Sequence, residues 1–341
     1  MKINLRILVP LCSLLLFWAA WPIAGTNVLA AGEARIRAES LTLEETEEGA
    51  LLTLEGPVEV VFEGDTLAAQ SAKVVLRADA DNLADALVSI ELSGGASLVA
   101  SDGAVAGAAG AVFIAVERRL VLRGGASFDQ GGLTASAGSC EYSIPKRIVT
   151  FIGGCRFSEG DVSGSCDSAE YDLNTRSGAL SGSVVVRYRS GEVFFADEPV
   201  DEIIMRAPTL HISVLEGEVR TGRAESGERT AMQAGEYSLE ADRVIFHATD
   251  NGLSEVSAEG DIRVEGPRRL RVRADKASLS TVDRILRVEG DVSFSVLNQQ
   301  GTAEALEVNF AEGWSVRLTG ASVGGAIEEA FEDDSGASEG Q

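Results

Sequence analysis

The 341-residue chain has few of the side chains on which most catalytic and metal sites depend. It holds four cysteines and two histidines, too few for most zinc sites, and only His211 and His247 could serve as a histidine base. Its 29 basic residues face 53 acidic ones, and a net charge of −24 repels the phosphates of nucleic acids. The sequence contains no nucleophile–base arrangement, phosphate-binding glycine loop or zinc spacing. We therefore expect neither an enzyme, nor a cofactor, nor a nucleic-acid partner.

Long apolar runs are also lacking, with one exception at the N-terminus. Lys2 and Arg6 flank the start of the apolar run 7–20, and the small-residue pattern Val28-Leu29-Ala30 follows it. This order is typical of a cleaved signal peptide, and an uncleaved membrane anchor is the alternative. We expect cleavage after Ala30 and an exported mature protein.

The rest of the chain is a repeat that glycine marks. Each copy opens with a glycine followed by apolar residues two and four positions later. Neighbouring copies lie 29, 30, 38 or 40 residues apart when the weaker copy at Gly222 is included. A period near 30 residues indicates a repeat architecture. The clearest of these glycines are Gly56, Gly94, Gly124, Gly153, Gly182, Gly260 and Gly290.

A second template follows each glycine segment, with apolar or small residues at positions 0, +2, +4, +7 and +9. Leu133, Ala135, Ala137, Cys140 and Tyr142 are one copy. Alternation with period two predicts a strand, and the change of phase after +4 predicts a bulge or bend. Turn sequences such as 130–132 and 159–161 predict hairpins. The expected fold class is all-β, an elongated repeat of antiparallel strands with two strands per repeat.

The recurring string G-x-V-x-V-x-x-G-D-x-L-x-A-x-x-A-x-V/Y resembles the OstA-like, LptA-type family of lipopolysaccharide transport proteins. The best copies are residues 56–74 and 259–279. The resemblance implies a β-jellyroll, open like a folded taco, that carries the acyl chains of lipopolysaccharide or a related glycolipid without enzymatic activity. It also implies a place in the periplasm, free or at the periphery of the inner or outer membrane. The implied partners are other transport-bridge jellyroll proteins and further copies of the chain, joined head to tail.

The chain is longer than the bridge proteins of that family, which suggests two tandem modules. We expect a signal peptide at residues 1–30, modules at 31–190 and 191–325, and an acidic disordered tail at 326–341. The first and last templates, Ile36–Leu43 and Ala303–Phe310, are expected to be edge strands that recruit another sheet.

Twelve side chains are candidates for a continuous apolar stripe that contacts acyl chains. Whether the facing sheets open around a lipid or close on a dry core is left open by the periodicity. The candidates are Val58, Val60, Leu98, Phe128, Tyr142, Phe157, Tyr171, Val186, Val264, Leu279, Phe294 and Phe310.

Two further groups of residues each have two interpretations. Arg268, Arg269, Arg271 and Arg273 could contact lipid phosphates or form a solvated strand face. Cys140, Cys155 and Cys166 fall at apolar positions, which favours buried core residues. A disulfide, Cys140–Cys166 or Cys155–Cys166, is the alternative in an oxidising compartment.

Two other classes of function compete with the lipid carrier. One is a secreted structural or adhesive β-solenoid without a lipid ligand, for which a period near 30 residues is also suitable. The other is a carbohydrate-acting β-helix enzyme, which needs clustered carboxylates, whereas the acidic residues here are scattered around the turns. The tight turns favour antiparallel hairpins over parallel coils.

Overall fold

The computed structural model describes residues 27–31, 34–47, 49–78, 80–189, 193–195, 198–215, 218–249, 252–296, 299–311 and 315–324. Most of the expected signal peptide and the whole expected acidic tail lie outside these residues. Within them the chain is almost entirely strand, and the described strand pairs are antiparallel, for example β8 with β9 and β19 with β20. The prediction of an all-β fold of antiparallel strands is therefore confirmed.

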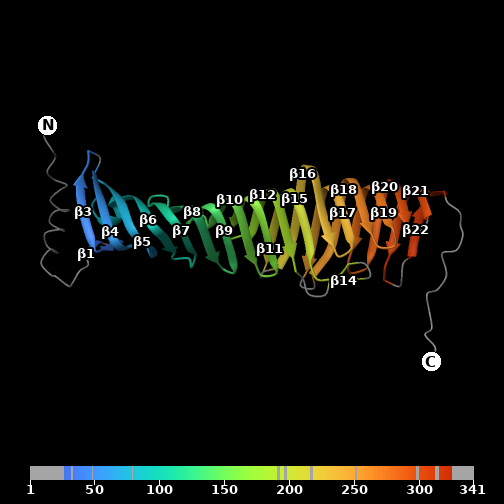
Figure 1. Ribbon diagram of the computed structural model, residues 1–341, viewed down its shortest axis with the longest axis horizontal. Coiled ribbons are helices and arrows are strands. Elements are labelled where there is room, and N and C mark those ends of the chain that lie inside the picture. Colours follow the sequence, from blue (N-terminus) through green and yellow to red (C-terminus); the bar gives the residue numbers. More distant parts are fainter. Residues whose placement is uncertain are drawn as a thin grey trace, which may run out of the picture. The chain divides into compact units, whose positions relative to one another are not determined.

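The chain forms two compact units. Unit 1 comprises the residues up to 160 together with 165–178, and unit 2 comprises 161–164 and the residues from 179 onward. The division falls within β11 and near the start of β12, earlier than the expected module boundary at 190, and the two functional modules remain a prediction. Within each unit the strands follow one another in chain order (Figure 1).

Unit 1 contains one short helix besides its strands. Its elements are β1 (Asn27–Ala31), β2 (Ala34–Ala38), β3 (Ser40–Glu45), β4 (Gly49–Phe62), β5 (Asp65–Arg77), α2 (Leu83–Ala86), β6 (Leu87–Val99), β7 (Val105–Ile114), β8 (Arg119–Gln130), β9 (Leu133–Ser143) and β10 (Ile148–Glu159). The strands at the division are β11 (Val162–Asp172) and β12 (Ser177–Tyr188).

Unit 2 continues the same pattern after a small separate hairpin. That hairpin consists of β13 (Val193–Phe195) and β14 (Glu198–Val200), which pair only with each other among the described residues. The remaining strands are β15 (Ile203–Leu215), β16 (Glu218–Ala234), β17 (Tyr237–Thr249), β18 (Gly252–Gly266), β19 (Leu270–Ser280), β20 (Ile285–Val296), β21 (Gln299–Asn309), β22 (Ser315–Thr319) and β23 (Ser322–Gly324).

The repeat glycines lie in the middle of long strands, where each strand bends. Gly124 has φ +80° and Gly153 has φ +86°, a backbone region that residues with a Cβ adopt only with strain. The strand register shifts at both positions, between Arg123 and Ala126 and between Ile152 and Arg156. The predicted bend is thus confirmed, but the expectation that a glycine opens each repeat is corrected. The residues before each glycine also alternate and pair, so the strand begins about five residues earlier than the sequence pattern suggested.

The bends divide each unit into two walls. In unit 1 the first wall includes 119–123 paired with 139–143, and the second wall includes 126–130 paired with 133–137. In unit 2 the first wall includes 276–280 paired with 285–289, and the second wall includes 271–273 paired with 293–295.

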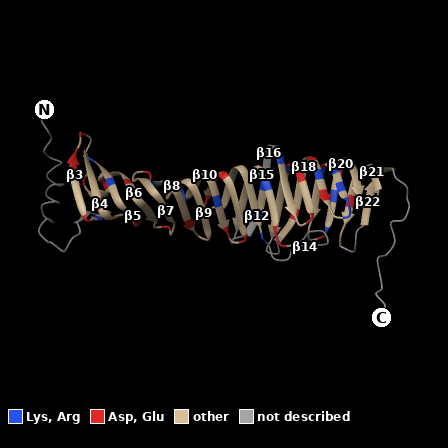
Figure 2. Cartoon of the chain, viewed as in Figure 1, with Lys and Arg blue, Asp and Glu red and all other residues tan. Residues whose placement is uncertain are grey.

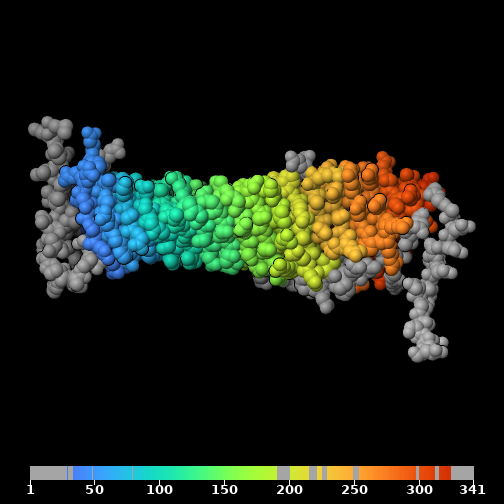
Figure 3. Space-filling view, viewed as in Figure 1, coloured from blue at the N-terminus to red at the C-terminus, as the bar shows by residue number. Residues whose placement is uncertain are grey.

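The two walls of each unit face one another across an apolar core. Aromatic rings from the first wall contact rings from the second wall with edge-to-face geometry. The pairs and their centroid distances are Phe62–Phe113 at 5.9 Å, Phe128–Tyr142 at 5.2 Å and Phe128–Phe151 at 6.0 Å in unit 1, and Tyr237–Phe310 at 6.1 Å in unit 2. On the face that Figure 3 shows, side chains of the described residues cover the interior of unit 1.

The edge strands agree only in part with the expected ones, because the second half of Ile36–Leu43 lies in the edge strand β3. Ala303–Phe310 is not an edge, because β21 pairs with β20 on one side and with β22 and β23 on the other. At the N-terminal end β2 pairs with both β1 and β4, whereas β3 pairs only with β4 among the described residues. The edges of the described structure are therefore β1 and β3 in unit 1 and β22 and β23 in unit 2.

Candidate functional site

The structure places the twelve stripe candidates on two facing walls rather than on one stripe. Eight lie in the second wall of their unit, at or after the bend of a strand. These are Val58, Val60, Leu98, Phe128, Phe157, Val186, Val264 and Phe294. Tyr142, Leu279 and Phe310 lie in the first wall, and Tyr171 occupies the position of Tyr142 one repeat later. All twelve are buried except Phe157, which is half-buried.

The interior is filled by these side chains and their neighbours. In unit 2 the apolar cavity between the walls has a volume of about 30 Å³, and Tyr237, Leu279 and Phe310 are among the residues that line it. That volume has room for about two water molecules. An acyl chain could enter this part of unit 2 only if the two walls moved apart.

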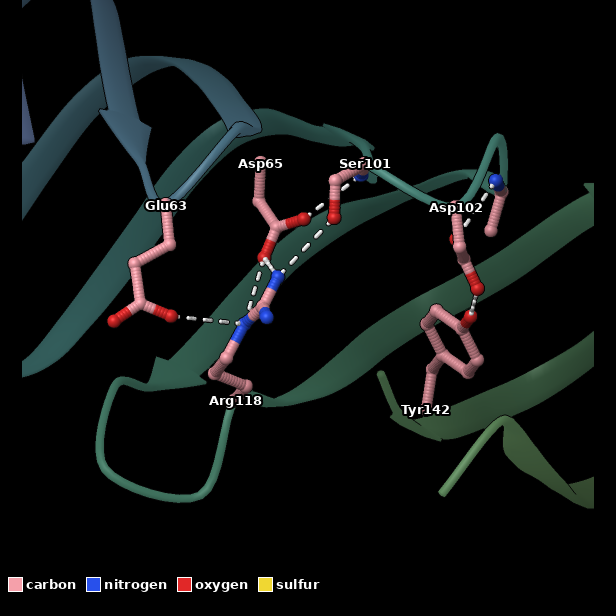
Figure 4. Close-up of polar contacts among 7 residues, drawn as sticks. Glu63, Asp65, Ser101, Asp102, Arg118 and Tyr142 are labelled. Atoms are coloured by element: carbon pink, nitrogen blue, oxygen red, sulfur yellow. Dashed lines mark hydrogen bonds and ion pairs between the residues drawn. The ribbon is translucent and has the colours of Figure 1, made fainter. Parts of the chain in front are cut away.

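Polar groups join the walls of unit 1 along the edge opposite the bends. Arg118, in a turn of the first wall, donates from Nη2 and Nε to Asp65 Oδ2 at 2.6 and 3.2 Å (Figure 4). Asp65 begins β5 in the second wall, and its other oxygen accepts the backbone N–H of Ser101 at 2.8 Å. The Asp65 side chain is fully buried, and Glu63 lies 3.5 Å from Arg118 Nε.

Asp102, in the next turn of the second wall, is the second acidic group on this edge. Its carboxylate accepts the hydroxyl hydrogen of Tyr142, and Arg147 Nη1 lies 3.8 Å away (Figure 4 shows Tyr142). Burial is the largest single influence on the pKa of Asp102, and by itself it raises that pKa. The hydrogen bonds from Tyr142, the Ala104 N–H and Gln130, with the charge of Arg147, outweigh burial and lower the Asp102 pKa.

Glu159, at the end of β10, is the third acidic group. It accepts the Tyr171 hydroxyl at 2.6 Å and forms a close ion pair with Arg176. Burial and the hydrogen bond to Glu159 raise the pKa of Tyr171, and burial and the hydrogen bond to Asp102 raise that of Tyr142. Both phenols are therefore neutral donors at neutral pH.

The sequence did not predict these contacts, although it contains part of the pattern. Arg118, Arg147 and Arg176 recur at intervals of 29 residues, the repeat period, as do Tyr142 and Tyr171. All three arginines end a turn in the left-handed region, with φ of 45°, 55° and 50°. Their acidic partners do not share one spacing, so the pairs could not be assigned without the fold.

The four basic candidates lie on the outside of unit 2. Arg268 and Arg269 form the turn before β19, and Arg271 and Arg273 are exposed along that strand. A surface hollow of about 520 Å³ is lined by Arg269 and Arg271 but not by Arg268 or Arg273. Figure 2 shows blue segments, which mark basic residues, along β18 and β20. The other residues that line the hollow are Glu265, Gly266, Leu270, Ser295 and Gln300.

The three described cysteines form no disulfide and are buried in unit 1, as expected for small core residues. Burial and the nearby charge of Glu141 raise the pKa of Cys140 to about 12, which makes its thiol unreactive at neutral pH. No group of three or more metal-ligating side chains is found among the described residues. No helix in that part of the chain is long and apolar enough to cross a membrane.

Comparisons with known proteins give partial similarity to solved structures. No family model and no curated protein matches the chain. A solved structure of LptH from Pseudomonas aeruginosa, described as the LptA-homologous periplasmic component of the lipopolysaccharide transport device, aligns with 35% of this chain and 82% of its own. The sequence identity over that alignment is 20% and the TM-score is 0.30, so the alignment does not show the family of this chain.

Proposed function

We propose that the chain is a periplasmic lipid-carrying protein of lipopolysaccharide transport and outer-membrane assembly. The observation that carries the proposal is the interior of each unit, where two walls of antiparallel strands face one another with mainly apolar side chains between them. The resemblance of the repeat to the OstA-like family supports the same function.

Binding requires the walls to separate by the width of a hydrocarbon chain. Burial of an acyl chain contributes about 0.8 kcal/mol per methylene, and it replaces wall-to-wall contacts such as Phe128–Phe151. The net affinity is the difference between these two terms. The walls can make this exchange away from the bends, because backbone hydrogen bonds run within each wall and the described cysteines form no disulfide between the walls.

The headgroup would bind outside the interior. Arg269 and Arg271 border a hollow large enough for a phosphorylated sugar, with Ser295 and Gln300 as further hydrogen-bonding groups. Glu265 in the same hollow opposes an anion, so the site favours a ligand that also presents hydroxyl groups.

Bridging to other proteins would use the edge strands. β22 and β23 each pair only with β21 among the described residues and expose most of their side chains. At the other end, cleavage after Ala30 would remove four of the five residues of β1 and leave the edge of β2 unpaired. An unpaired strand edge recruits another strand.

Photo-cross-linking tests the lipid ligand. A photoreactive residue replaces Phe128 or Leu279 in the interior, and a matched one replaces Ile152, which is 56% exposed on the outer face. With purified lipopolysaccharide we expect adducts at one interior position at least and only background at Ile152. A folded protein in which the interior positions react no more than Ile152 would contradict the proposal.

A structural or adhesive β-protein without a ligand is the second candidate. The small volume of the unit 2 cavity favours it, because a closed apolar core needs no ligand. The parallel-coil form of that hypothesis is wrong, since the described pairs are antiparallel. The cross-linking experiment separates the two candidates.

A further inference from the structure

We propose that three groups of ion pairs and hydrogen bonds form a latch that holds the walls of unit 1 closed along the edge opposite the bends. The latch consists of Asp65 with Arg118, Asp102 with Tyr142 and Arg147, and Glu159 with Tyr171 and Arg176. Its role in admitting acyl chains rests on the proposed function, whereas its role in holding the walls together does not.

The position of the latch follows from the topology. The two walls are joined covalently at the bends, so a groove between them can open only at the far edges, where the turns lie. Arg118 ends a first-wall turn, and Asp65 lies 53 residues earlier at a second-wall turn. Each latch contact joins one far edge to the other. Opening unit 1 therefore requires these contacts to break.

The chemistry of the latch suits a closure that can be reversed. A core intended only for stability gains little from buried carboxylates, because apolar side chains of similar volume are often equally stabilising there. Asp65 and Glu159 are nevertheless buried at this edge and are neutralised by arginines that stay partly exposed. An arginine at the rim can exchange its carboxylate for water, whereas a packed side chain cannot.

The corresponding positions of unit 2 differ in part. Arg284 has the place of the turn arginines of unit 1, with φ of 55°, but Leu279 and Phe310 stand in the first wall where unit 1 has Tyr142 and Tyr171. The second-wall turn before β19 carries Arg268 and Arg269, and the acidic residue of the turn before β17, Glu236, is exposed rather than buried. Unit 2 also contains the apolar cavity between its walls. We therefore assign entry of an acyl chain to unit 2 and latched closure to unit 1.

Hydrogen exchange on the full chain tests the closure directly. The latch variant carries Arg118→Gln, Arg147→Gln and Arg176→Gln. The control carries Arg119→Gln, Arg123→Gln and Arg156→Gln, which remove the same charge from outward-facing positions of unit 1. The reporters at the far edges are the amides of Ser101, Ile144 and Leu173.

We expect these three amides to exchange at least about tenfold faster in the latch variant than in the wild type and the control. Amides beside the bends, such as Ser139 and Arg123, should keep their wild-type rates. Unchanged rates at the far edges, or equal acceleration at edges and bends, would overturn the latch. Should the triple variant not fold, Tyr142→Phe with Tyr171→Phe removes two contacts without changing charge and is judged by the same amides.

Lipid capture tests the consequence for acyl chains. A photoreactive residue at Phe128 should react with lipopolysaccharide only when the latch variant is used, while one at Leu279 should react in both backgrounds. Capture at Phe128 in the wild type, or at Leu279 alone in both, would overturn the gating role. Absence of capture everywhere would overturn the proposed function, and hydrogen exchange would still decide whether the latch exists.

Discussion

Replacing Arg118 with alanine should destabilise unit 1 far more than replacing its neighbour Arg119. Both arginines carry the same charge and have similar exposure, 26% and 30% of the side chain. Their acceptors differ, because the Asp65 side chain is 0% exposed, whereas Glu117 and Glu141 are 55% and 46% exposed. The comparison therefore isolates the burial of the acceptor.

The expected magnitudes follow from that difference. Without Arg118, Asp65 Oδ2 loses both of its guanidinium donors and remains a buried charge, a loss that costs about 3–5 kcal/mol. Water can reach part of the space that Arg118 leaves, so we expect about 3 kcal/mol. The pairs of Arg119 are exposed, and their loss should cost at most about 1 kcal/mol.

Native-state hydrogen exchange of β8 and β9 amides gives the free energy of opening for unit 1 alone, which a whole-chain unfolding curve does not. Adding Asp65→Asn to Arg118→Ala should restore about 2 kcal/mol, because the cost arises from the unpaired charge. Equal losses for Arg118→Ala and Arg119→Ala would refute the assignment of Asp65 as a buried ion-pair partner.

Three further predictions concern the bends and the latch. Gly153→Ala should lower the free energy of unfolding by about 1 kcal/mol or more, because φ is +86° at this position. Gly107→Ala should be near neutral, because the nearest atom to its new Cβ is Ser127 Oγ at 3.4 Å, and urea melts compare the two variants. The lowered pKa of Asp102 adds stability that is complete above its ordinary pKa of 3.8 and is lost as pH falls below that value, so acid melts of Asp102→Asn should lack this loss. Gln130→Glu should destabilise unit 1 by about 1 kcal/mol or more in thermal melts, because it replaces the amide that donates to Asp102 with a second buried carboxylate beside it; a gain of stability would contradict this contact.

The sequence by itself determined the local structure. Alternation with period two determines strands because successive side chains point to opposite faces, and Gln130-Gly131-Gly132 determines a tight hairpin because both glycines reach positive φ, at 60° and 94°. The glycine register located the bends, since Gly124 and Gly153 adopt a backbone conformation that other residues avoid. These signals are short-range, and a sequence displays them directly.

Only the tertiary structure decided how the strand halves meet. Phe128 and Tyr142 share an apolar phase in sequence, yet they lie on opposite walls and contact one another across the core. The same holds for Asp65 and Arg118, which are 53 residues apart and become partners only when both far edges come together. The repeat pattern also did not predict the edge strands β22 and β23, because these short, exposed segments show little alternation of apolar and polar residues. Periodicity records which side of a strand is apolar, but the partner of that side depends on the bend angle and register of the whole sheet.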